Sequence, residues 1–494
     1  MFNAAAVRTA LVLAAISATS PQTQAGFITS VPAYAVPVGP DYSIIPLFSS
    51  GDRVPRTGAP GLEYQFIGIP DGLGAHPNTD GTLTVYINHE LGNNSQHEPC
   101  LFQPLNRGAI VSRLVLAPDG SVLDGDRGYD SIYLENDFYG PPAEVGNSTP
   151  GFTRFCAGSL SWLEAGFDRP IYLAGEESGS PGTFDRRGGY LVAIFDNELH
   201  TIPKAGRIAW ENALVQPKAG VQTVIMCMED GAVMESQLYM YVGHKDHSPG
   251  ASALRRNGLD NGALYVFVSN ARKRNSEVNV QDGTIQGKWV LIPGAEAMTD
   301  DELEVATDSV GAFAFARPED GAFSKTDPNT YYFVTTGGGT GNMLGRLYRL
   351  DLNPDNVLGS VRLTVVYNAD HVVADGGDIA VSPDNIDLSE DYLMICEDGT
   401  GQSRVVMADK GRNGNIWRLN LQTGAMENVA ELTAVGRTGL TVGPGVWETT
   451  GIIETSAFFG PDSWLFNVQA HPPTPAPPQN TVEDGQLLLM RRNR

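Results

Sequence analysis

The sequence predicts an all-β protein, built as a single large β-propeller of six blades with loops and short helices inserted between the strands. Short apolar runs rich in β-branched and aromatic residues alternate with turns of Asp, Gly, Asn and Pro, as in LTVYINHE, GYLVAIFDNELH and GALYVFVSN. Helical periodicity is scarce and is found in stretches such as GAEAMTDDELEVA. A chain of 494 residues is too long for one two-sheet sandwich, whereas radial repetition accommodates many short strands.

Composition supports this fold class and limits the partners. A hydrophobic content of 41% is ample for a core, while 56 Gly and 32 Pro imply many tight turns. The formal net charge is −24, so the surface repels nucleic acids and anionic membranes, and we expect neither as a partner. If the substrate is an anion, bound multivalent cations must reverse the local field.

Three parts of the chain are expected from local composition. Residues 1–25 have the basic start, apolar stretch and small-residue end of an export signal, so we expect an exported protein, periplasmic or extracellular. Residues 26–471 form the propeller and catalytic domain, and residues 472–494 comprise a Pro-rich segment and a C-terminal strand. We expect a monomer.

Four cysteines leave two interpretations open. In an exported protein they allow two disulfides in three pairings. Cys227 and Cys396 lie in apolar strand-like runs and are expected to be small buried residues. Cys156 lies in a Gly-bearing turn upstream of paired acids, so it either forms a bridge with Cys100 or serves as a thiolate ligand.

Acidic residues end many of the predicted strands. Loops on one face of a propeller converge on its central channel, where several carboxylates repel one another unless they are protonated or neutralised by cations. Calcium suits such an arrangement, and a thiolate favours a transition metal. For any single acid, a solvated loop remains the alternative. The candidates are Glu90, Glu176, Glu177, Glu229, Asp230, Glu319, Asp320, Asp384, Glu397 and Asp398.

Arg317 is the candidate for binding an anion. It stands in GAFAFARPEDGAF, beside Glu319 and Asp320. A guanidinium next to metal-binding acids binds a phosphate or carboxylate through two hydrogen bonds, although a simple pair with Glu319 is the alternative. The sequence contains no G-x-S-x-G elbow, no H-E-x-x-H, no P-loop and no dinucleotide fingerprint.

An ordered series of segments between about residues 85 and 471 resembles the PhoX-type alkaline phosphatases, a family of secreted propeller enzymes. The segments are YINHE, RFCAGSL followed by YLAGEES, AGRIAWENA, AFARPEDGAF, VSPDN followed by ICEDG, and WETTGIIETSAFFGPDSWLFNVQAHP. The resemblance implies a phosphomonoesterase that hydrolyses small phosphate esters at a central cluster of iron and calcium. It makes Arg317 the catalytic, phosphate-contacting residue. It implies metal ligands at Cys156, Glu211, Glu319, Asp384 and Asp398, with Glu177 and Asp246 as further acids.

Three departures from the family pattern leave other functions open. The leader has the single Arg8 instead of a twin arginine, the family's GDD is replaced by residues 243–246 (GHKD), and its GTW segment is replaced by AGFDRPIY. The first alternative is a non-catalytic calcium-binding propeller that acts as an interaction module. The second is a propeller esterase or lactonase that uses calcium alone.

Overall fold

The computed structural model describes residues 26–437, 439–471 and 478–493. The predicted export signal lies outside these residues, as does most of the Pro-rich segment. Among the described residues, no helix is both long and apolar enough to cross a membrane.

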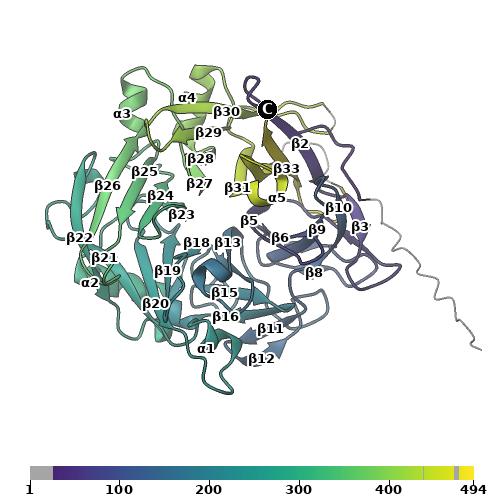
Figure 1. The fold of residues 1–494 in the computed structure, drawn as a ribbon, viewed down its shortest axis with the longest axis horizontal. Helices are drawn as coiled ribbons and strands as arrows, with labels where there is room; N and C mark the ends of the chain where they lie inside the picture. Colours follow the sequence, from purple (N-terminus) through teal and green to yellow (C-terminus); the bar gives the residue numbers. More distant parts are fainter. Residues whose placement is uncertain (1–25, 438, 472–477, 494) are drawn as a thin grey trace, which may run out of the picture.

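The protein is mostly β and propeller-like, with its sheets arranged radially around a central channel (Figure 1). The strands nearest the channel, which we call the inner strands, form a closed ring in which each contacts the next and the last contacts the first. They are β5 (Pro70–Pro77), β13 (Phe155–Ser161), β18 (Trp210–Val215), β23 (Pro318–Phe323), β27 (Pro383–Leu388) and β31 (Glu448–Glu454).

Each inner strand pairs antiparallel with the strand outside it, which we call its second strand, and further strands extend each sheet outward. The first sheet contains β5, β6 (Leu83–His89), β9 (Ile110–Leu116) and β10 (Val122–Arg127). The second contains β13, β14 (Ile171–Glu176), β15 (Gly189–Phe195), β16 (Glu198–Thr201), β11 (Ser131–Leu134) and β12 (Asp137–Gly140), with β17 (Arg207–Ile208) paired to β15.

The third sheet holds two inner strands, because its outer strands join. Its order is β18, β19 (Gln222–Glu229), β20 (Leu238–His244), β21 (Ala263–Ser269), β22 (Thr284–Leu291), β26 (Val361–Asn368), β25 (Arg346–Asp351), β24 (Thr330–Thr335) and β23. The fourth contains β27, β28 (Tyr392–Glu397), β29 (Asn415–Asn420), β30 (Met426–Leu432) and β1 (Ala35–Pro37). The fifth contains β31, β32 (Ser463–Ala470), β33 (Asp484–Arg492) and β2 (Tyr42–Ser49).

Smaller elements decorate the outside and the loops. Two short hairpins are β3 (Arg53–Pro55) with β4 (Glu63–Gln65), and β7 (Gln96–His97) with β8 (Asn106–Arg107). The α-helices are α1 (Ala253–Arg256), α2 (Asp300–Val310), α3 (Ala369–Ala374), α4 (Gly401–Lys410) and α5 (Ser456–Phe459). The 3₁₀ turns are Leu163–Ala165, Pro203–Ala205, Glu277–Asn279 and Ala295–Ala297. The one helical pattern read from the sequence corresponds to α2, which Thr299 and Glu302 cap reciprocally.

The core lies between neighbouring sheets. Strands such as β15 are buried along their whole length, because apolar side chains on both faces pack against an adjacent sheet. In the cluster between the second and third sheets, Leu173 and Leu191 pack with Ile225, Tyr239 and Tyr241, all almost fully buried. Face-to-face packing of this kind holds the inner strands at fixed positions around the channel.

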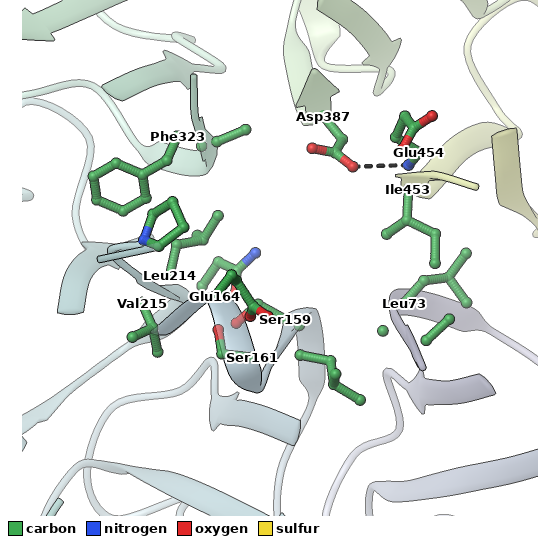
Figure 2. Close-up of a pocket in the computed structure, with 18 of the residues that line it drawn as sticks. Leu73, Ser159, Ser161, Glu164, Leu214, Val215, Phe323, Asp387, Ile453 and Glu454 are labelled. Atoms are coloured by element: carbon green, nitrogen blue, oxygen red, sulfur yellow. Dashed lines mark hydrogen bonds between the residues drawn. The ribbon is translucent and has the colours of Figure 1, made fainter. Parts of the chain in front are cut away.

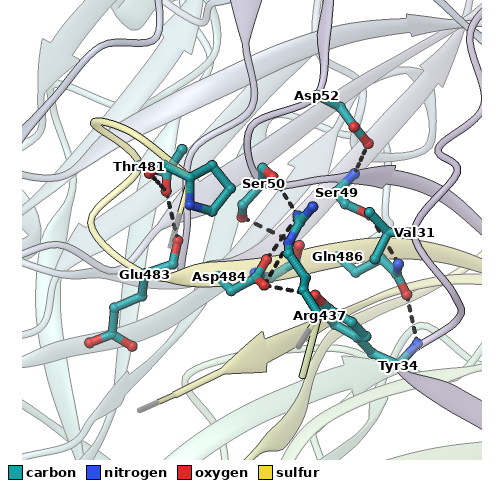
Figure 3. A network of polar contacts seen from close by, with 12 residues as sticks. Val31, Tyr34, Ser49, Ser50, Asp52, Arg437, Thr481, Glu483, Asp484 and Gln486 are labelled. Atoms are coloured by element: carbon teal, nitrogen blue, oxygen red, sulfur yellow. Dashed lines mark hydrogen bonds and ion pairs between the residues drawn. The ribbon is translucent and has the colours of Figure 1, made fainter. Parts of the chain in front are cut away.

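The ring is closed by strands from the two ends of the described chain. β33 pairs with β32 on one side and with β2 on the other. Figure 3 shows the polar contacts beside this junction: the Tyr34 hydroxyl donates to Asp484 Oδ2 at 2.7 Å, and Arg437 Nε donates to the same carboxylate at 2.8 Å. The Tyr34 amide donates to Gln486 Oε1 at 2.7 Å. These contacts fix β33 against the N-terminal segment.

Candidate metal centre

Every inner strand is interrupted near its start by a β-bulge. In β5, for example, Pro70 pairs with His89 but the next pair is Leu73 with Ile87, so one extra residue is left on the inner strand. A bulge breaks the ladder and redirects the side chain that follows the last pair. We call the residue directly after that pair the bulge position. The bulge positions are Asp71, Cys156, Glu211, Glu319, Asp384 and Gly451.

A second residue position recurs beside each of the first five bulges, directly after the paired residue of the second strand. In β6 this residue is Glu90, whose N–H donates to the carbonyl of Ile69 at 3.0 Å. The same backbone bond recurs at 2.9–3.0 Å in the other four sheet units, so the main chain sets both positions. The residues at the second position are Glu90, Glu177, Asp230, Thr336 and Asp398.

The residue before the inner strand is often strained. Ile69, Arg154, Arg317 and Ser382 have φ values of 50°, 40°, 61° and 46°, in a region that side chains other than glycine rarely adopt. Such strain persists only where the surrounding structure enforces it, and it concentrates at functional sites. Its recurrence at four equivalent places marks this end of the channel.

The sixth inner strand differs. Gly451 has a φ of 55°, and a Cβ at this residue would lie 2.1 Å from the carbonyl oxygen of Asp71. A side chain is therefore excluded at this bulge position. Glu448, at the start of β31, supplies the carboxylate of this strand instead.

The two kinds of position bring ligand atoms together in four overlapping groups, each with three ligand atoms within 4.8 Å of one another. Neighbouring groups share Cys156, Glu211 or Asp384, so the four form one continuous chain of sites. The groups are Asp71–Glu90–Cys156, Cys156–Glu177–Glu211, Glu211–Glu319–Asp384 and Asp384–Asp398–Glu448.

Two carboxylate oxygens in these four groups are buried and accept no hydrogen bond from any described residue. Glu211 Oε1 accepts a bond from the Ala157 amide at 3.2 Å, but its Oε2 has no partner among the described residues. Glu319 Oε1 lies 3.3 Å from Arg317 Nη2 as an ion pair, but the contact does not have hydrogen-bond geometry. Buried oxygens of this kind cost free energy unless something outside the chain satisfies them.

Burial and mutual repulsion act on the pKa values of the same side chains. Burial, followed by the charges of Glu319 and Glu177, raises the pKa of Glu211 well above its usual range. The pKa of Asp384 is raised in the same way, by burial and then by Glu319. Burial also raises the pKa of the Cys156 thiol, which donates a hydrogen bond to Asp71 Oδ2 at 3.2 Å. Without a cation, this cluster holds protons.

The donor set fits metal ions. Two groups contain the sulfur of Cys156 together with carboxylates, and two contain carboxylate oxygens alone. Cations between these side chains remove the repulsion that raises their pKa values and satisfy the oxygens that lack donors. Acidic groups that could hold metal ions therefore line this end of the channel.

The structure brings together most of the predicted ligands and leaves one apart. Cys156, Glu177, Glu211, Glu319, Asp384 and Asp398 all belong to the four groups. Asp246 does not, because Trp210 pairs with Glu229 at one end of β19 while Gln222 pairs with His244 at the other. The loop that carries Asp246 thus lies at the opposite end of this sheet from Glu211.

Neighbouring acids divide into two classes by strand alternation. Glu176 accepts hydrogen bonds from the backbone amides of Thr153, Phe184 and Tyr190 at 2.9–3.2 Å, so it braces loops while Glu177 faces the channel. Glu397 likewise binds Arg412 and two backbone amides. Glu229 accepts a bond from the Gln237 amide at 3.0 Å. The candidates Glu176, Glu229 and Glu397 are therefore structural, whereas Glu177 and Asp398 join the groups and Asp230 binds Arg317 at their edge.

Arg317 lies at the edge of the groups. Its Nε and Nη2 donate to the two oxygens of Asp230, both at 2.8 Å, and its side chain is 26% exposed. The charge of Glu319, and then the hydrogen bonds and charge of Asp230, raise the pKa of Arg317 although burial opposes this, so the guanidinium stays charged. The main protein partner of Arg317 is therefore Asp230, so the pair with Glu319 alone, the alternative considered from the sequence, is not what forms.

All four cysteines are free and buried. The Cys100–Cys156 bridge considered from the sequence is not formed. Cys100 lies beside Asp126, with its Sγ 3.7 Å from the carboxylate, whereas Cys156 is in the channel. Cys227 and Cys396 are fully buried, as predicted from their apolar strands.

Two members of the groups were missed in the sequence. Asp71 and Glu448 were not among the candidates, and Glu90 was a candidate without an assigned role. Asp71 carries a signal that could have identified it: Pro70–Asp71 repeats the proline–acid pair of Pro318–Glu319 and Pro383–Asp384. Proline is tolerated as the first residue of an edge strand, which is the position that each of these prolines occupies.

Comparisons with known proteins agree with this geometry. The family model described as alkaline phosphatase PhoX matches residues 185–470. The chain is similar in structure to PhoX of Pseudomonas fluorescens in complex with vanadate, a transition state analogue, with a TM-score of 0.64, 18% identity, and coverage of 94% of this chain and 97% of that one. It is more distantly similar to an α-L-arabinofuranosidase from Fusarium graminearum (TM-score 0.43, 10% identity, coverage of 90% and 98%). No curated protein matches the sequence.

Proposed function

This chain belongs to the PhoX family of alkaline phosphatases, and from that membership we propose that it hydrolyses phosphate monoesters. The proposed site is formed by the four groups of ligand side chains in the channel, which would hold metal ions between them. The family places the chain among the phosphoric monoester hydrolases. One observation of this structure carries the proposal to particular residues. Five acids and Cys156, one from each inner strand, converge at one end of the channel, where oxygens are unsatisfied and pKa values are raised.

The chemistry of the donors supports two kinds of ion. A thiolate selects a transition metal, and the family resemblance implies that this metal is iron, so we assign iron to the two groups that share Cys156. Calcium prefers oxygen ligands, so we assign it to the two groups built around Asp384. Glu211 belongs to one group of each kind and would bridge them. The proposed ligands are Cys156, Glu211, Glu319, Asp384, Asp398 and Glu177, with Asp71, Glu90 and Glu448 added. Asp246 is not proposed.

Bound ions would screen the charge of the ester phosphate, polarise its oxygens and make an oxygen nucleophile available. The chain's own contribution is positioning. The backbone bond beside each of the first five bulges fixes the ligands before substrate arrives, which reduces the reorganisation needed in the reaction. Arg317, at the edge of the groups, carries a positive charge that can attract the anion directly.

Arg317 is the proposed phosphate contact. Its Nε and Nη2 are committed to Asp230, whereas Nη1 has no partner in the part of the chain that the structure describes. That nitrogen can donate to a phosphate oxygen while Asp230 keeps the guanidinium plane fixed. Charge developing on the equatorial oxygens of the phosphoryl group would be stabilised there.

Three finer features complete the proposal. Divided between β22 and β26, the nine-stranded sheet gives two units with inner strands β18 and β23. Together with the other four sheets, these two units support a six-bladed propeller. Export is supported by the leader sequence, so metal loading takes place in the periplasm or outside the cell. A monomer is proposed because the ring closes within one chain through β2 and β33.

The test is hydrolysis of p-nitrophenyl phosphate by purified protein, before and after removal of metal with a chelator. We expect activity that chelation abolishes and that calcium and iron together restore. Full activity in chelator would contradict the metal-dependent mechanism. Calcium binding without any phosphatase activity would favour the interaction module.

A further inference from the structure

A second cavity opens at the other end of the channel. It has a volume of about 560 Å³ and is lined by residues from all the inner strands. Each inner strand runs from its bulge toward this cavity. In β5 the bulge position is Asp71, and Leu73 is the first residue that lines the cavity. In β27 the bulge position is Asp384, and Ile386 is the first residue that lines it. The cavity is therefore separate from the carboxylate groups.

A polar bridge closes the floor between the two sites. Asp320 accepts hydrogen bonds from Asn212 Nδ2 at 2.6 Å and from the Ile386 amide at 3.0 Å, which ties three neighbouring inner strands together. Burial raises its pKa to about 7. Because its carboxylate already accepts these hydrogen bonds, Asp320 has a structural role at the bottom of the cavity. A ligand would contact the walls of the cavity instead.

The walls are apolar. Leu160, Leu214 and Ile453 are only partly buried, although each packs against a core cluster, because each also lines the cavity. Figure 2 shows Leu214 and Ile453 on opposite sides of the open centre. A cavity of this size with mainly aliphatic walls has the character of a small-molecule site.

The mouth has an excess of negative charge. Lys325 lies 3.4 Å from Asp387, and its pKa is raised by that carboxylate and then by Glu454 and Glu164. Three carboxylates, two at the ends of inner strands and Glu164 in the 3₁₀ turn Leu163–Ala165, thus act on one ammonium group. Glu454 Oε1 accepts a bond from the Ser456 amide and Glu164 Oε1 one from the Trp162 amide, so each retains an oxygen for another donor.

One buried hydroxyl also awaits a partner. Ser161 is 6% exposed and lines the cavity beside Glu164, as Figure 2 shows. Its Oγ forms no hydrogen bond with any described residue. A donor or acceptor that enters from the mouth can bond to this hydroxyl, which is open to the cavity.

We propose that this cavity is a second binding site, for a small aliphatic diamine: one ammonium group lies beside Glu164 and Ser161, the other lies across the opening beside Glu454 (Figure 2), and the carbon chain lies against Leu160, Leu214 and Ile453. The excess of two negative charges over Lys325 excludes anions such as phosphate esters. The site therefore takes a different class of ligand from the one at the bulges, and it does not depend on the phosphatase activity.

Calorimetric titration of metal-loaded protein with 1,6-diaminohexane tests the proposal. The informative variant is Glu164→Gln/Glu454→Gln, which leaves the Lys325–Asp387 pair intact. Its control is Asp301→Asn/Asp308→Asn on α2, which removes two exposed carboxylates outside the cavity. We expect the diamine to bind wild type and the control equally, and the Glu164→Gln/Glu454→Gln variant at least tenfold more weakly. Hydrolysis of p-nitrophenyl phosphate should be unchanged in all three.

Two further titrations complete the design. 1-Hexanol, which has the carbon chain without the charge, should bind at least tenfold more weakly than the diamine. If the double variant does not fold, the single variant Glu164→Gln at an exposed residue replaces it, with a severalfold loss expected. No saturable binding to wild type, equal affinity across the variants, or equal binding of hexanol would each overturn the proposal.

Discussion

Arg317 and Asp230 form a two-pronged ion pair at the edge of the carboxylate groups, with Nε and Nη2 each 2.8 Å from one oxygen of the acid. Asp230 occupies the same position after β19 that Glu90, Glu177 and Asp398 occupy after their strands. Those three belong to the ligand groups and Asp230 does not. After β19, the residue at the second position therefore orients Arg317 instead of joining a ligand group.

The first prediction concerns this pair. Asp230→Asn should raise KM for p-nitrophenyl phosphate by roughly tenfold with kcat changed less, because the guanidinium loses its fixed orientation for the anion. Arg317→Ala should lower kcat/KM by about a hundredfold or more. Since Asp230 acts through Arg317, the double variant should be no worse than Arg317→Ala. The control is Asp351→Asn, which frees Arg362 at the outer end of β25. Additive losses in the double variant would show that Asp230 has a separate role.

The second prediction concerns the sixth bulge. Gly451→Ala should destabilise the protein by more than about 3 kcal/mol and lower its metal content, because the new Cβ would displace the backbone of Asp71. Gly250→Ala is the matched control: its φ is also positive, at 86°, but nothing lies within 4 Å of its Cβ. That substitution should cost only about 1 kcal/mol. Thermal unfolding and metal analysis of both variants check this, and equal destabilisation would refute the close-packed bulge.

The third prediction separates the two kinds of ion. Cys156→Ala should remove iron and most phosphatase activity while calcium remains bound, because the other two groups contain only carboxylates. Cys227→Ala, at a fully buried cysteine in the core, should lose stability but keep both metals. Elemental analysis of the two variants provides the measurement. An active Cys156→Ala enzyme would instead indicate chemistry with calcium alone.

The fourth prediction is the pH dependence of stability without metal. Burial raises the pKa of Glu176 and of Glu229 to about 8, and that of Asp71 to about 7. The folded protein therefore holds protons that the unfolded chain releases near pH 4 to 4.5. These three groups therefore make stability fall as pH rises from about 4.5 to about 8, and the lowered pKa values of His89 and His97 offset part of the fall below about pH 6.5.

Differential scanning calorimetry of chelated protein should show this loss as a fall in Tm of about 5 °C or more between pH 5 and pH 8. Metal-loaded protein should lose less, since cations replace the protons at Asp71 and its neighbours. A Tm that is constant or increases over this interval in the chelated protein would be inconsistent with proton-loaded carboxylates.

The sequence was sufficient for the β-rich, propeller-like fold, and its motifs included six of the side chains that the structure brings together in the groups. Apolar strands that alternate with turn residues specify the fold locally, because strands such as β15 are buried on both faces. Short motifs located Cys156 and Glu319. They could not show that Glu176 faces away from the channel while Glu177 faces into it, since this depends on the register of β14 against β13.

Two outcomes needed the three-dimensional structure. Asp246 resembles a family acid, but the direction of β20 carries it to the far end of its sheet. Asp71 and Glu448 reach the channel because the ring closes between β31 and β5, a contact between distant parts of the chain. Local pattern contains no information on such a contact, although the repeated proline–acid pair was present at Asp71.

Elemental analysis of the purified enzyme, with hydrolysis of p-nitrophenyl phosphate measured on the same sample, tests the central claim most directly. Wild type should contain both calcium and iron, with more than one ion per chain. Glu211 is shared by one group that contains Cys156 and one group that contains carboxylates alone, so the Glu211→Gln variant should lose both metal and activity. An active wild-type enzyme with less than one ion per chain, or an active Glu211→Gln variant with its full metal content, would contradict the account.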